Sequence, residues 1–548
     1  MKPRRRLFVF ALALMICSVR AEDGPKVDAP VGTIHGRTRT IDDVGVDEFL
    51  GIPYARPPIG KLRFALPAPF GPVGNLRATE FIARCPQPLL SPLLQNPVPT
   101  AEDCLHLNVF RKSGTKQGDA KAVIVVLHGG AFCIGSAADT NTGILSALGD
   151  VIVVTPNYRL GVLGFADMKD LAPGNLGLYD QRLALEWVQD NIRAFGGNPD
   201  KVTLFGASAG SMSVSAQINS PVNREGRPLF HAAIMDAGVA APGIVVDADL
   251  SLKRIKSIAE KLACPTKGPK MLDCIRKADV NELIKLSYNP EEYSPIYTFH
   301  PTVDGKFIPR DVAKDVRDNA KGFMKVKMLI GTSKDEGTMF ASNRIDFTGD
   351  FFMNLTTEGE FLDHIGRLAA GFKFPLNLTD SDVRRKVTDA YYQKSSSRFL
   401  DAAAFVGDGI FICPTNAFVR SYSKTHPNVH AFRFERVVRQ ANFFFDPKKL
   451  GVFHTSFTLY ACGSVIAFET VTPNEPANAE DNAFSLDVIQ VVTNFAKSDA
   501  SPEFRGVKWP DFGKGEGVMV LDEKPRVEKG LFSEDRCEKV FPFFESAP

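Results

Sequence analysis

A serine lies between small residues at 206–210, which read Gly-Ala-Ser-Ala-Gly. The apolar run 202–205 precedes it and the helix-capable stretch 211–219 follows it, so we expect a strand, a tight turn and a helix around Ser208. Such a turn raises the hydroxyl above the end of a sheet, where a side chain at either glycine would collide with neighbouring backbone. The motif predicts that Ser208 is a nucleophile for acyl transfer.

A second glycine-rich segment has the character of an oxyanion hole. The apolar run 122–127 leads into His-Gly-Gly-Ala-Phe at 128–132, where two glycines let backbone N–H groups turn towards one point. A tetrahedral intermediate carries negative charge on the former carbonyl oxygen, and each donor aimed at it is worth ~10²–10³ in rate. A glycine-rich turn without chemistry is the alternative, but the serine turn argues against it. We expect the amides of Gly129, Gly130 and Ala209 to be the donors.

Short apolar, β-branched runs alternate with helical periods along the chain, which indicates a parallel sheet. Active sites of such sheets lie at the carboxyl ends of the strands, and both motifs directly follow such runs. The predicted fold class is α/β, with a large, mostly parallel central sheet flanked by helices. Strands are expected at 122–127, 151–155, 202–205, 232–235, 328–330 and 429–434, and a helix at 183–192.

Composition and charge restrict the class of partner. The 548 residues are 44% hydrophobic and 23% charged, as in ordinary globular proteins that bury a large core. The formal net charge of +2 produces no long-range field that would attract nucleic acid or an anionic membrane. A small, neutral or mixed substrate is therefore expected. No Cys or His cluster has the spacing of zinc ligands, so no metal is expected.

The first residues are typical of a targeting segment. Residues 1–21 combine basic residues, a short apolar run and small or aliphatic residues suited to cleavage, which predicts a secretory signal peptide followed by one domain over 22–548. No later segment approaches the ~20 apolar residues of a membrane span, and residues 544–548 match neither an anchor signal nor a retention signal. We expect a secreted, extracellular protein without a membrane anchor. Asn354 and Asn377 begin glycosylation sequons, although such sequons also arise by chance.

Cysteine usage agrees with an oxidising compartment. Removal of Cys17 with the signal peptide leaves eight of the nine cysteines. Sequence spacing favours two local disulfides, Cys85 with Cys104 and Cys264 with Cys274. Spacing leaves the other pairings open, because eight cysteines allow 105 connectivities.

The chain resembles the type B carboxylesterase/cholinesterase family of α/β-hydrolases over nearly all of its mature length, and general carboxylesterases most of all. The resemblance implies the α/β-hydrolase fold, a serine esterase that needs no cofactor, and an ion pair between Arg63 and Glu102. The motifs that carry it are Phe-Leu-Gly-Ile-Pro-Tyr-Ala at 49–55, Glu-Asp-Cys-Leu at 102–105, Leu-Asn-Val at 107–109, Asn-Tyr-Arg-Leu-Gly at 157–161, Gly-Asn-Leu-Gly-Leu at 174–178, Asp-Gln at 180–181, Trp-Val at 187–188 and Phe-Gly-Gly-Asn-Pro at 195–199.

The same resemblance implies a third disulfide, Cys413 with Cys537. Cys133 and Cys462 are then left over. We expect two free, buried thiols, and a fourth disulfide is the alternative.

Chain order restricts the catalytic base, because this fold presents Ser, then Asp or Glu, then His. Of nine histidines, only His364, His426, His430 and His454 lie late enough. His430 falls inside an apolar run, His426 precedes a proline in a turn, and His364 is expected on a charged helix face. His454, in Gly-Val-Phe-His at 451–454, resembles the catalytic histidine of the family.

The catalytic acid is expected at Glu336. It belongs to Gly-Thr-Ser-Lys-Asp-Glu-Gly at 331–337, which is similar to the acid-bearing loop of the family. Asp335 is the neighbouring alternative, and we expect it to face solvent. In the predicted mechanism His454 removes the proton of Ser208, Glu336 orients the imidazole, and water hydrolyses the acyl-enzyme.

Two departures from the family are linked. Relatives usually have a serine before Gly238 and an acidic residue three positions after the histidine, whereas this chain has Ala237 and Phe457. Loss of one polar group would leave the other buried without a partner at a cost of ~1–3 kcal/mol, but loss of both is nearly neutral for stability. We therefore expect an active enzyme with a modest kcat.

Other residues disfavour choline esters. A quaternary ammonium group needs an aromatic face and a nearby carboxylate, but Ala207 stands where cholinesterases carry glutamate. The family's choline tryptophan lies in the first disulfide loop, whereas Trp187 and Trp509 belong to scaffold motifs; that loop offers Leu89, Leu90, Leu93 and Leu94. A small-molecule ester is thus the expected partner. A cholinesterase and a non-enzymatic adhesion protein are the alternatives, and both monomer and homodimer stay open.

Overall fold

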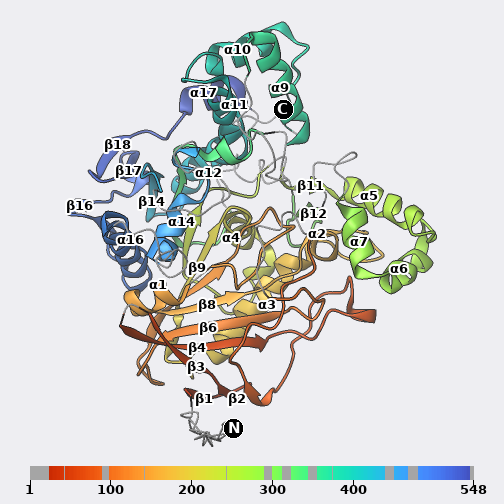
Figure 1. The fold of residues 1–548 in the computed structure, drawn as a ribbon, viewed down its shortest axis with the longest axis vertical. Coiled ribbons are helices and arrows are strands. Elements are labelled where there is room, and N and C mark those ends of the chain that lie inside the picture. The colour runs from red at the N-terminus through yellow and green to blue at the C-terminus, as the bar shows by residue number, and fades with distance from the viewer. Residues whose placement is uncertain are drawn as a thin grey trace, which may run out of the picture.

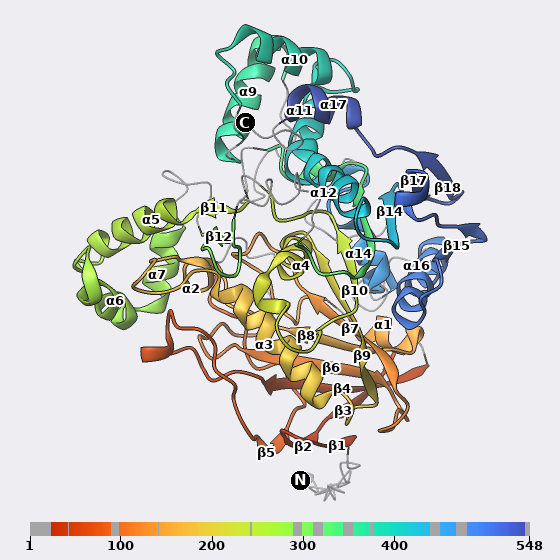
Figure 2. The ribbon, with the colours of Figure 1, turned by 180° about the vertical axis from the view of Figure 1, so that it is seen from behind.

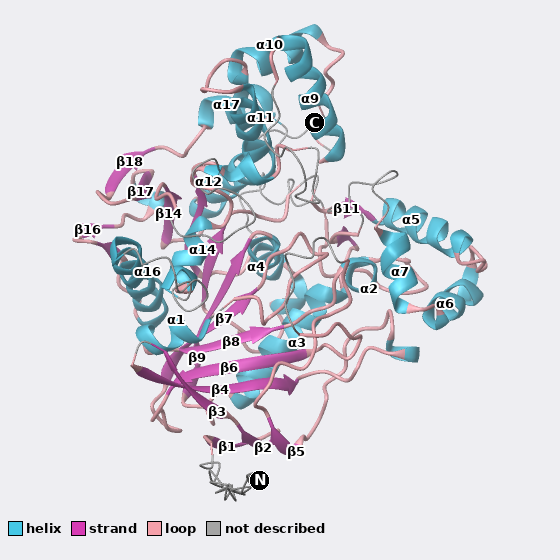
Figure 3. Ribbon diagram, viewed as in Figure 1, coloured by secondary structure: helices cyan, strands magenta, loops and turns pink. Residues whose placement is uncertain are grey.

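The computed structural model describes residues 24–542 except 42, 89–97, 141, 242–243, 289–298, 311–321, 343–354, 373, 375, 439–449 and 467–478. The expected signal peptide, the sequon at Asn354 and the leucine-rich part of the first disulfide loop lie outside the described residues. Figure 3 shows a large sheet surrounded by helices.

The strands form one large sheet and several small ones. The bounds of the strands are β1 Lys26–Ala29, β2 Gly32–His35, β3 Arg37–Ile41, β4 Val44–Pro53, β5 Gly74–Arg77, β6 His106–Lys112, β7 Lys121–Leu127, β8 Ile152–Pro156, β9 Gly197–Ala207, β10 Ala232–Asp236, β11 Val246–Asp247, β12 Thr302–Val303, β13 Lys327–Ser333, β14 Val429–Phe434, β15 Glu503–Phe504, β16 Val507–Lys508, β17 Gly517–Leu521 and β18 Arg526–Lys529.

The described helices fall between and after these strands. Their bounds are α1 Thr142–Gly149, α2 Gly161–Phe165, α3 Leu176–Asn191, α4 Ala209–Asn219, α5 Ala248–Lys261, α6 Gly268–Lys277, α7 Val280–Ser287, α9 Glu358–Gly371, α10 Ser381–Tyr391, α11 Arg398–Gly407, α12 Cys413–Ser423, α14 Ser456–Ala461, α16 Ala479–Lys497 and α17 Glu534–Val540.

The large sheet has 11 strands in the order β18-β17-β14-β13-β10-β9-β7-β8-β6-β4-β3. The pairs from β17 to β8 are parallel, and the outer pairs are antiparallel. The prediction of a mostly parallel α/β sheet is confirmed, and every strand expected from the sequence is present. The helix expected at 183–192 begins earlier, at Leu176, because Asn175 in the left-handed conformation already turns the chain into it.

Side chains of the central strands alternate between two cores. In β7, Val123, Val125 and Leu127 belong to one cluster, whereas Ile124 and Val126 belong to the other. Helices α3 and α4 cover the first face and α1 and α16 the second, and Figure 2 shows α3 and α4 in front of the strands. A strand buried on both faces reads as a continuous apolar run. This explains why these runs were visible in the sequence.

Two groups of helices project from the sheet. In Figure 1, α5, α6 and α7 form one lobe at the right, and α9, α10, α11 and α17 gather at the top. Helices α11 and α12 are joined by a π-helical segment, Asp408–Ile412, into one continuous helix, Arg398–Ser423. Contrary to expectation, its 26 residues are long and apolar enough to cross a membrane. In its most apolar window 94% of the residues are buried inside the protein. It is therefore packed as a core helix.

The structure contains three disulfides, Cys85–Cys104, Cys264–Cys274 and Cys413–Cys537. The implied ion pair is also present, because Nε and Nη2 of Arg63 donate to the two oxygens of Glu102 at 2.7 and 2.5 Å.

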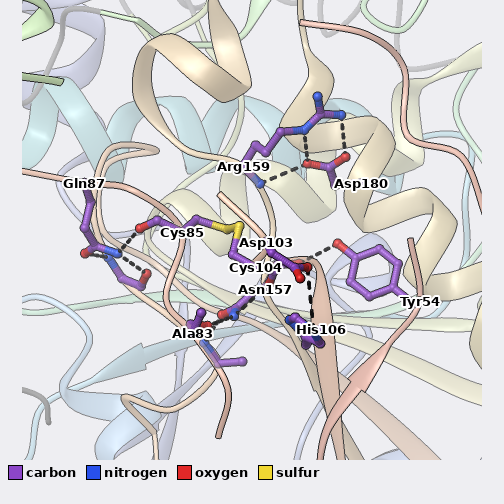
Figure 4. The surroundings of a disulfide bond; sticks show 12 residues. Tyr54, Ala83, Cys85, Gln87, Asp103, Cys104, His106, Asn157, Arg159 and Asp180 are labelled. Atoms are coloured by element: carbon purple, nitrogen blue, oxygen red, sulfur yellow. Dashed lines mark hydrogen bonds and ion pairs between the residues drawn. A yellow bond between two sulfur atoms is a disulfide. The ribbon is translucent and has the colours of Figure 1, made fainter. Parts of the chain in front are cut away.

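The first disulfide lies beside the chain that follows the glycine-rich segment. Beside Cys85, the amide of Gln87 donates to the carbonyls of Cys85 and Gly135 at 2.9 and 3.0 Å, and its oxygen accepts the Gly135 N–H at 2.9 Å (Figure 4). Asn157 donates to the Cys104 carbonyl at 3.1 Å. The disulfide region and the segment that follows Gly130 are thus held together.

Candidate active site

The backbone at Ser208 is strained. Its φ of 56° and ψ of −126° lie in a region that side-chain-bearing residues rarely adopt. Strand β9 ends directly before it and α4 begins directly after it. Its N–H donates to the carbonyl of Asp236 at 2.9 Å, which ties the turn to the neighbouring strand β10. The expected strand, turn and helix are present.

Both glycines of the turn are required by close backbone contacts. A Cβ on Gly206 would lie 2.2 Å from the carbonyl oxygen of Gly210, and a Cβ on Gly210 would lie 2.1 Å from that of Leu127 in β7. Real Cβ atoms do not approach oxygen so closely. The expected collision is confirmed.

Gly210→Ala is expected to destabilise the protein by at least about 3 kcal/mol, the upper end of ordinary overpacking, because the obstacle is the backbone of β7 and cannot rotate away. Thermal unfolding of the purified variant measures the loss. Gly371→Ala is the matched control, since nothing lies within 4 Å of its Cβ position at the end of α9. Equal thermal stability of the two variants would contradict the prediction.

Glu336 and His454 form a buried pair. Oε2 of Glu336 accepts a hydrogen bond from Nδ1 of His454 at 2.5 Å, and Oε1 accepts the Ser333 N–H at 2.6 Å. Glu336 begins the short 3-10 helix Glu336–Met339, with two residues between it and the end of β13, and its side chain is fully buried. The carboxylate therefore holds one ring nitrogen of the histidine and leaves the other, Nε2, to face elsewhere.

Aromatic rings fix the plane of His454. Phe411 lies over the imidazole with ring centroids 4.1 Å apart, and Phe340 meets it edge-on at 5.1 Å. Nε2 is buried and has no hydrogen-bond partner among the described residues. This nitrogen is available to accept a proton.

Asp335 is half-buried and so less exposed than expected. Its N–H donates to the carbonyl of Val452 at 2.9 Å, and its carboxylate accepts the Val452 N–H at 2.8 Å. Burial raises the pKa of this carboxyl. Asp335 therefore joins the loop of Glu336 to the loop that leads to His454, and its contacts are with backbone.

The glycine-rich segment approaches the serine closely. A Cβ on Gly129 would lie 2.9 Å from the carbonyl oxygen of Ala207 and 3.1 Å from the Cβ of Ser208, so only glycine fits without displacement. Gly130 has a φ of +106°, which also favours glycine. Ala209 is the first residue of α4, and a first-turn N–H has no partner within its helix. The expected donor residues all adjoin Ser208 or its cavity.

A cavity of about 300 Å³ brings these groups together. Its walls are mostly apolar, and Ser208 and His454 are among the polar groups that line it. The lining residues are Val126, Leu127, His128, Gly129, Gly130, Ala131, Cys133, Ile134, Asp139, Thr140, Phe205, Ala207, Ser208, Met339, Phe340, His454, Thr455, Thr458, Leu459 and Ser464.

Cys133 and Cys462 are free thiols, as expected. Cys462 is buried, whereas Cys133 is only half-buried and contacts the cavity; its thiol donates to the Gly130 carbonyl at 3.6 Å. Burial raises the pKa of each thiol to about 12, so both stay protonated at neutral pH. Neither thiol is a competing nucleophile.

The other late histidines lie away from the cavity. His430 is a core residue of β14, and its Nδ1 lies 3.0 Å from the Pro510 carbonyl oxygen. His426 is buried and stacks on Tyr422. His364 is on a helix as expected, but it is fully buried and its Nε2 lies 2.7 Å from the carbonyl oxygen of Ala341. His364 was expected on a charged face of its helix, but other parts of the protein pack over it.

The two departures from the family, Ala237 and Phe457, are chain neighbours of Asp236 and Thr458, a hydrogen-bonded pair that the sequence did not predict. Phe457 packs on Phe432 with ring centroids 4.5 Å apart, and Ala237 is buried with a φ of 61°. Asp236, directly before Ala237, is fully buried and accepts hydrogen bonds from Thr458. The sequence feature that could have predicted Asp236 was an acidic residue directly after the apolar run 232–235.

Among the residues with assigned placement, no group of three His, Cys, Asp or Glu could hold a metal ion.

Comparison with known proteins agrees with this geometry. The Carboxylesterase family model matches residues 23–538. The chain is 32% identical to the pyrethroid hydrolase Ces2e of Rattus norvegicus, over 95% of this chain and 91% of that protein. It is 31% identical to the acetylcholinesterase of Danio rerio, over 94% and 88%, and 31% identical to carboxylesterase 5A of Felis catus, over 94% of both. The chain therefore belongs to the carboxylesterase family, an α/β-hydrolase family of carboxylic ester hydrolases.

Proposed function

We propose that the protein is a secreted serine carboxylesterase in which Ser208 is the nucleophile, His454 the general base and Glu336 the residue that orients it. The observation that supports this most directly is the buried Glu336–His454 pair, whose free nitrogen and Ser208 border one cavity. The charged Glu336 carboxylate selects the imidazole tautomer with its proton on Nδ1, so that Nε2 is the acceptor.

The reaction follows from these positions. His454 Nε2 takes the proton of Ser208 as Oγ bonds to the ester carbonyl carbon, and the amides of Gly129, Gly130 and Ala209 stabilise the oxyanion. Collapse of this intermediate breaks the bond to the alcohol, which leaves with the proton from His454. Water then attacks the acyl-enzyme, again with His454 as base, and the carboxylic acid departs while Ser208 regains its proton.

The lining of the cavity is suited to neutral, apolar ester substrates. Val126, Phe205, Met339 and Leu459 line it, and Ala207 adds no charge next to the serine. Large apolar walls with few polar groups bind apolar ligands by burial of their surface. The relatives carry names for pyrethroid, acylcarnitine and choline ester hydrolysis, so the names alone do not select a substrate.

Choline esters are disfavoured because neither tryptophan borders the described part of this cavity. Trp509 is buried and donates to the Ala431 carbonyl at 2.8 Å, and Trp187 packs in α3 against Phe195. A cation at Ser208 would meet neither an indole face nor a carboxylate at position 207.

Secretion belongs to the same proposal. Three disulfides suit an oxidising compartment. Asn377 lies exposed in a loop, where Thr379 donates to its side-chain oxygen, so an oligosaccharide has access to it. Asn354 is proposed on its sequon alone.

A substrate panel and an active-site label test the proposal. The purified protein should hydrolyse aryl and alkyl esters in preference to choline esters, with a modest kcat. A fluorophosphonate should release fluoride and leave one phosphonyl group on Ser208, which peptide mass spectrometry would detect. Preference for choline esters would refute the substrate class. Absence of both hydrolysis and label would favour a binding protein.

A further inference from the structure

Asp236 links the nucleophile to the segment that carries the base. It is the last residue of β10, and its carbonyl accepts the Ser208 N–H at 2.9 Å. Its carboxylate oxygen Oδ2 accepts hydrogen bonds from Oγ1 and N–H of Thr458 at 2.6 and 3.1 Å. Thr458 belongs to the first turn of α14 and comes four residues after His454. The main chain of Asp236 thus contacts the nucleophile, and its side chain contacts the helix that follows His454.

The two carboxylate oxygens of Asp236 differ. Oδ2 receives both donors, whereas Oδ1 is buried and has no hydrogen-bond partner among the described residues. A charged oxygen in such a place is costly, because nothing replaces its lost hydration. A proton on Oδ1 removes this cost and leaves Oδ2 free to accept from Thr458.

The surroundings also favour the neutral acid. Glu336 from the helix Glu336–Met339 adds negative charge, and burial together with this charge raises the pKa of Asp236 to about 8. The other titratable groups are His454 and Cys462 at the two ends of α14. Strands β9 and β13 place Ala207 and Gly331 beside Asp236, and α4 contains no titratable residue. Among the described residues, no lysine or arginine is one of the groups that shift the pKa of Asp236, so no permanent cation offsets its charge.

We propose that Asp236 is a positioning residue of the triad, which as a neutral carboxylic acid joins Ser208 to the helix after His454 and leaves Glu336 as the charged member of the two buried carboxyls. This rests on the proposed function. Ionisation of Asp236 places a second buried negative charge beside Glu336. The oxyanion of the reaction then forms against a repulsive field. Activity should therefore fall as Asp236 loses its proton.

The pH profile of kcat is the first test. In wild type, kcat should fall above pH ~8, whereas Asp236→Asn, which keeps an acceptor for Thr458 and cannot ionise, should lack this fall. Thr458→Val removes a hydrogen bond that lowers the pKa of Asp236, so the fall should move to higher pH. Thr493→Val is the matched control, because that buried threonine donates to the Ile489 carbonyl in α16. Identical alkaline limbs in wild type and Asp236→Asn would overturn the proposal.

Thermal stability is the second test and does not depend on activity. Native Asp236 retains a proton between pH ~4 and ~8 that the unfolded chain has lost, so its contribution to stability is full below pH ~4 and declines as pH rises to ~8. The Tm of Asp236→Asn minus that of wild type should thus rise by on the order of 4 °C between pH 5 and pH 9. A constant difference would contradict the neutral acid.

Ser208→Ala separates this inference from the proposed function. If that variant hydrolyses esters like wild type, the proposed triad is wrong. The same Ser208→Ala protein, combined with Asp236→Asn, still gives the pH-dependent Tm difference and so tests Asp236 independently.

Discussion

Ser208→Ala is expected to lower kcat by ~10⁵–10⁶-fold, because the variant retains the binding cavity and the backbone donors but lacks the atom that forms the acyl-enzyme. Alanine has the same Cβ as serine, so the strained turn is no harder to form, and the Tm should change little. Initial rates with an aryl ester at saturating concentration, together with a thermal unfolding curve, measure both effects.

Ser215→Ala is the matched control for this variant. Ser215 lies in the same helix α4 and is buried. Its hydroxyl donates to the Met212 carbonyl at 2.7 Å and accepts the Ala240 N–H at 2.7 Å. Its loss leaves the buried Ala240 N–H without that acceptor, so it should cost about 1–3 kcal/mol of stability and leave kcat within a few-fold of wild type. Near-wild-type hydrolysis by Ser208→Ala would rule out the serine mechanism.

Glu336→Gln is expected to lower kcat by ~10⁴-fold while the fold is preserved. The glutamine oxygen can still accept the Ser333 N–H, which leaves the NH₂ group facing Nδ1 of His454. An amide donor at this point forces the ring proton onto Nε2, the nitrogen that must accept the proton of Ser208. The same steady-state assay, carried out across pH 6–9, measures the loss.

Asp335→Asn distinguishes this electronic effect from a disturbance of the loop. Asp335 is adjacent, carries the same group and contacts the backbone of Val452. Its replacement should lower kcat less than ~10-fold, because the tautomer of His454 does not depend on it. Comparable losses in the two variants would show that Glu336 has no special role.

The local order of residues was sufficient to predict several parts of the site. The turn at Ser208 and the segment at Gly129 each consist of an apolar strand followed by small residues, and these local backbone requirements are visible in a short stretch of sequence. The pair of Glu336 and His454 followed from chain order and family resemblance. The central strands were predictable because a strand buried on both faces is apolar throughout.

Burial that depends on contacts between distant segments was harder to predict from the sequence. Asp335 was expected in solvent, but it is half-buried and accepts a hydrogen bond from the backbone of Val452, 117 positions away in the chain. The helix of His364 was anticipated, whereas its burial depends on neighbouring helices and the Ala341 carbonyl. Periodicity describes an element and does not specify what packs on its polar face.

The sequence by itself determined the fold class, the family and the residues that could do the chemistry, because strand patterns and strained glycine turns are local and leave a direct record in residue types. Only the tertiary structure showed that the Asp236 carboxylate meets Thr458. Asp236 and Thr458 are 222 positions apart, and their contact arises because parallel strands deliver their carboxyl ends to the same edge where α14 returns. The removal of water from this edge, and with it the protonation of Asp236, is a property of the assembled core.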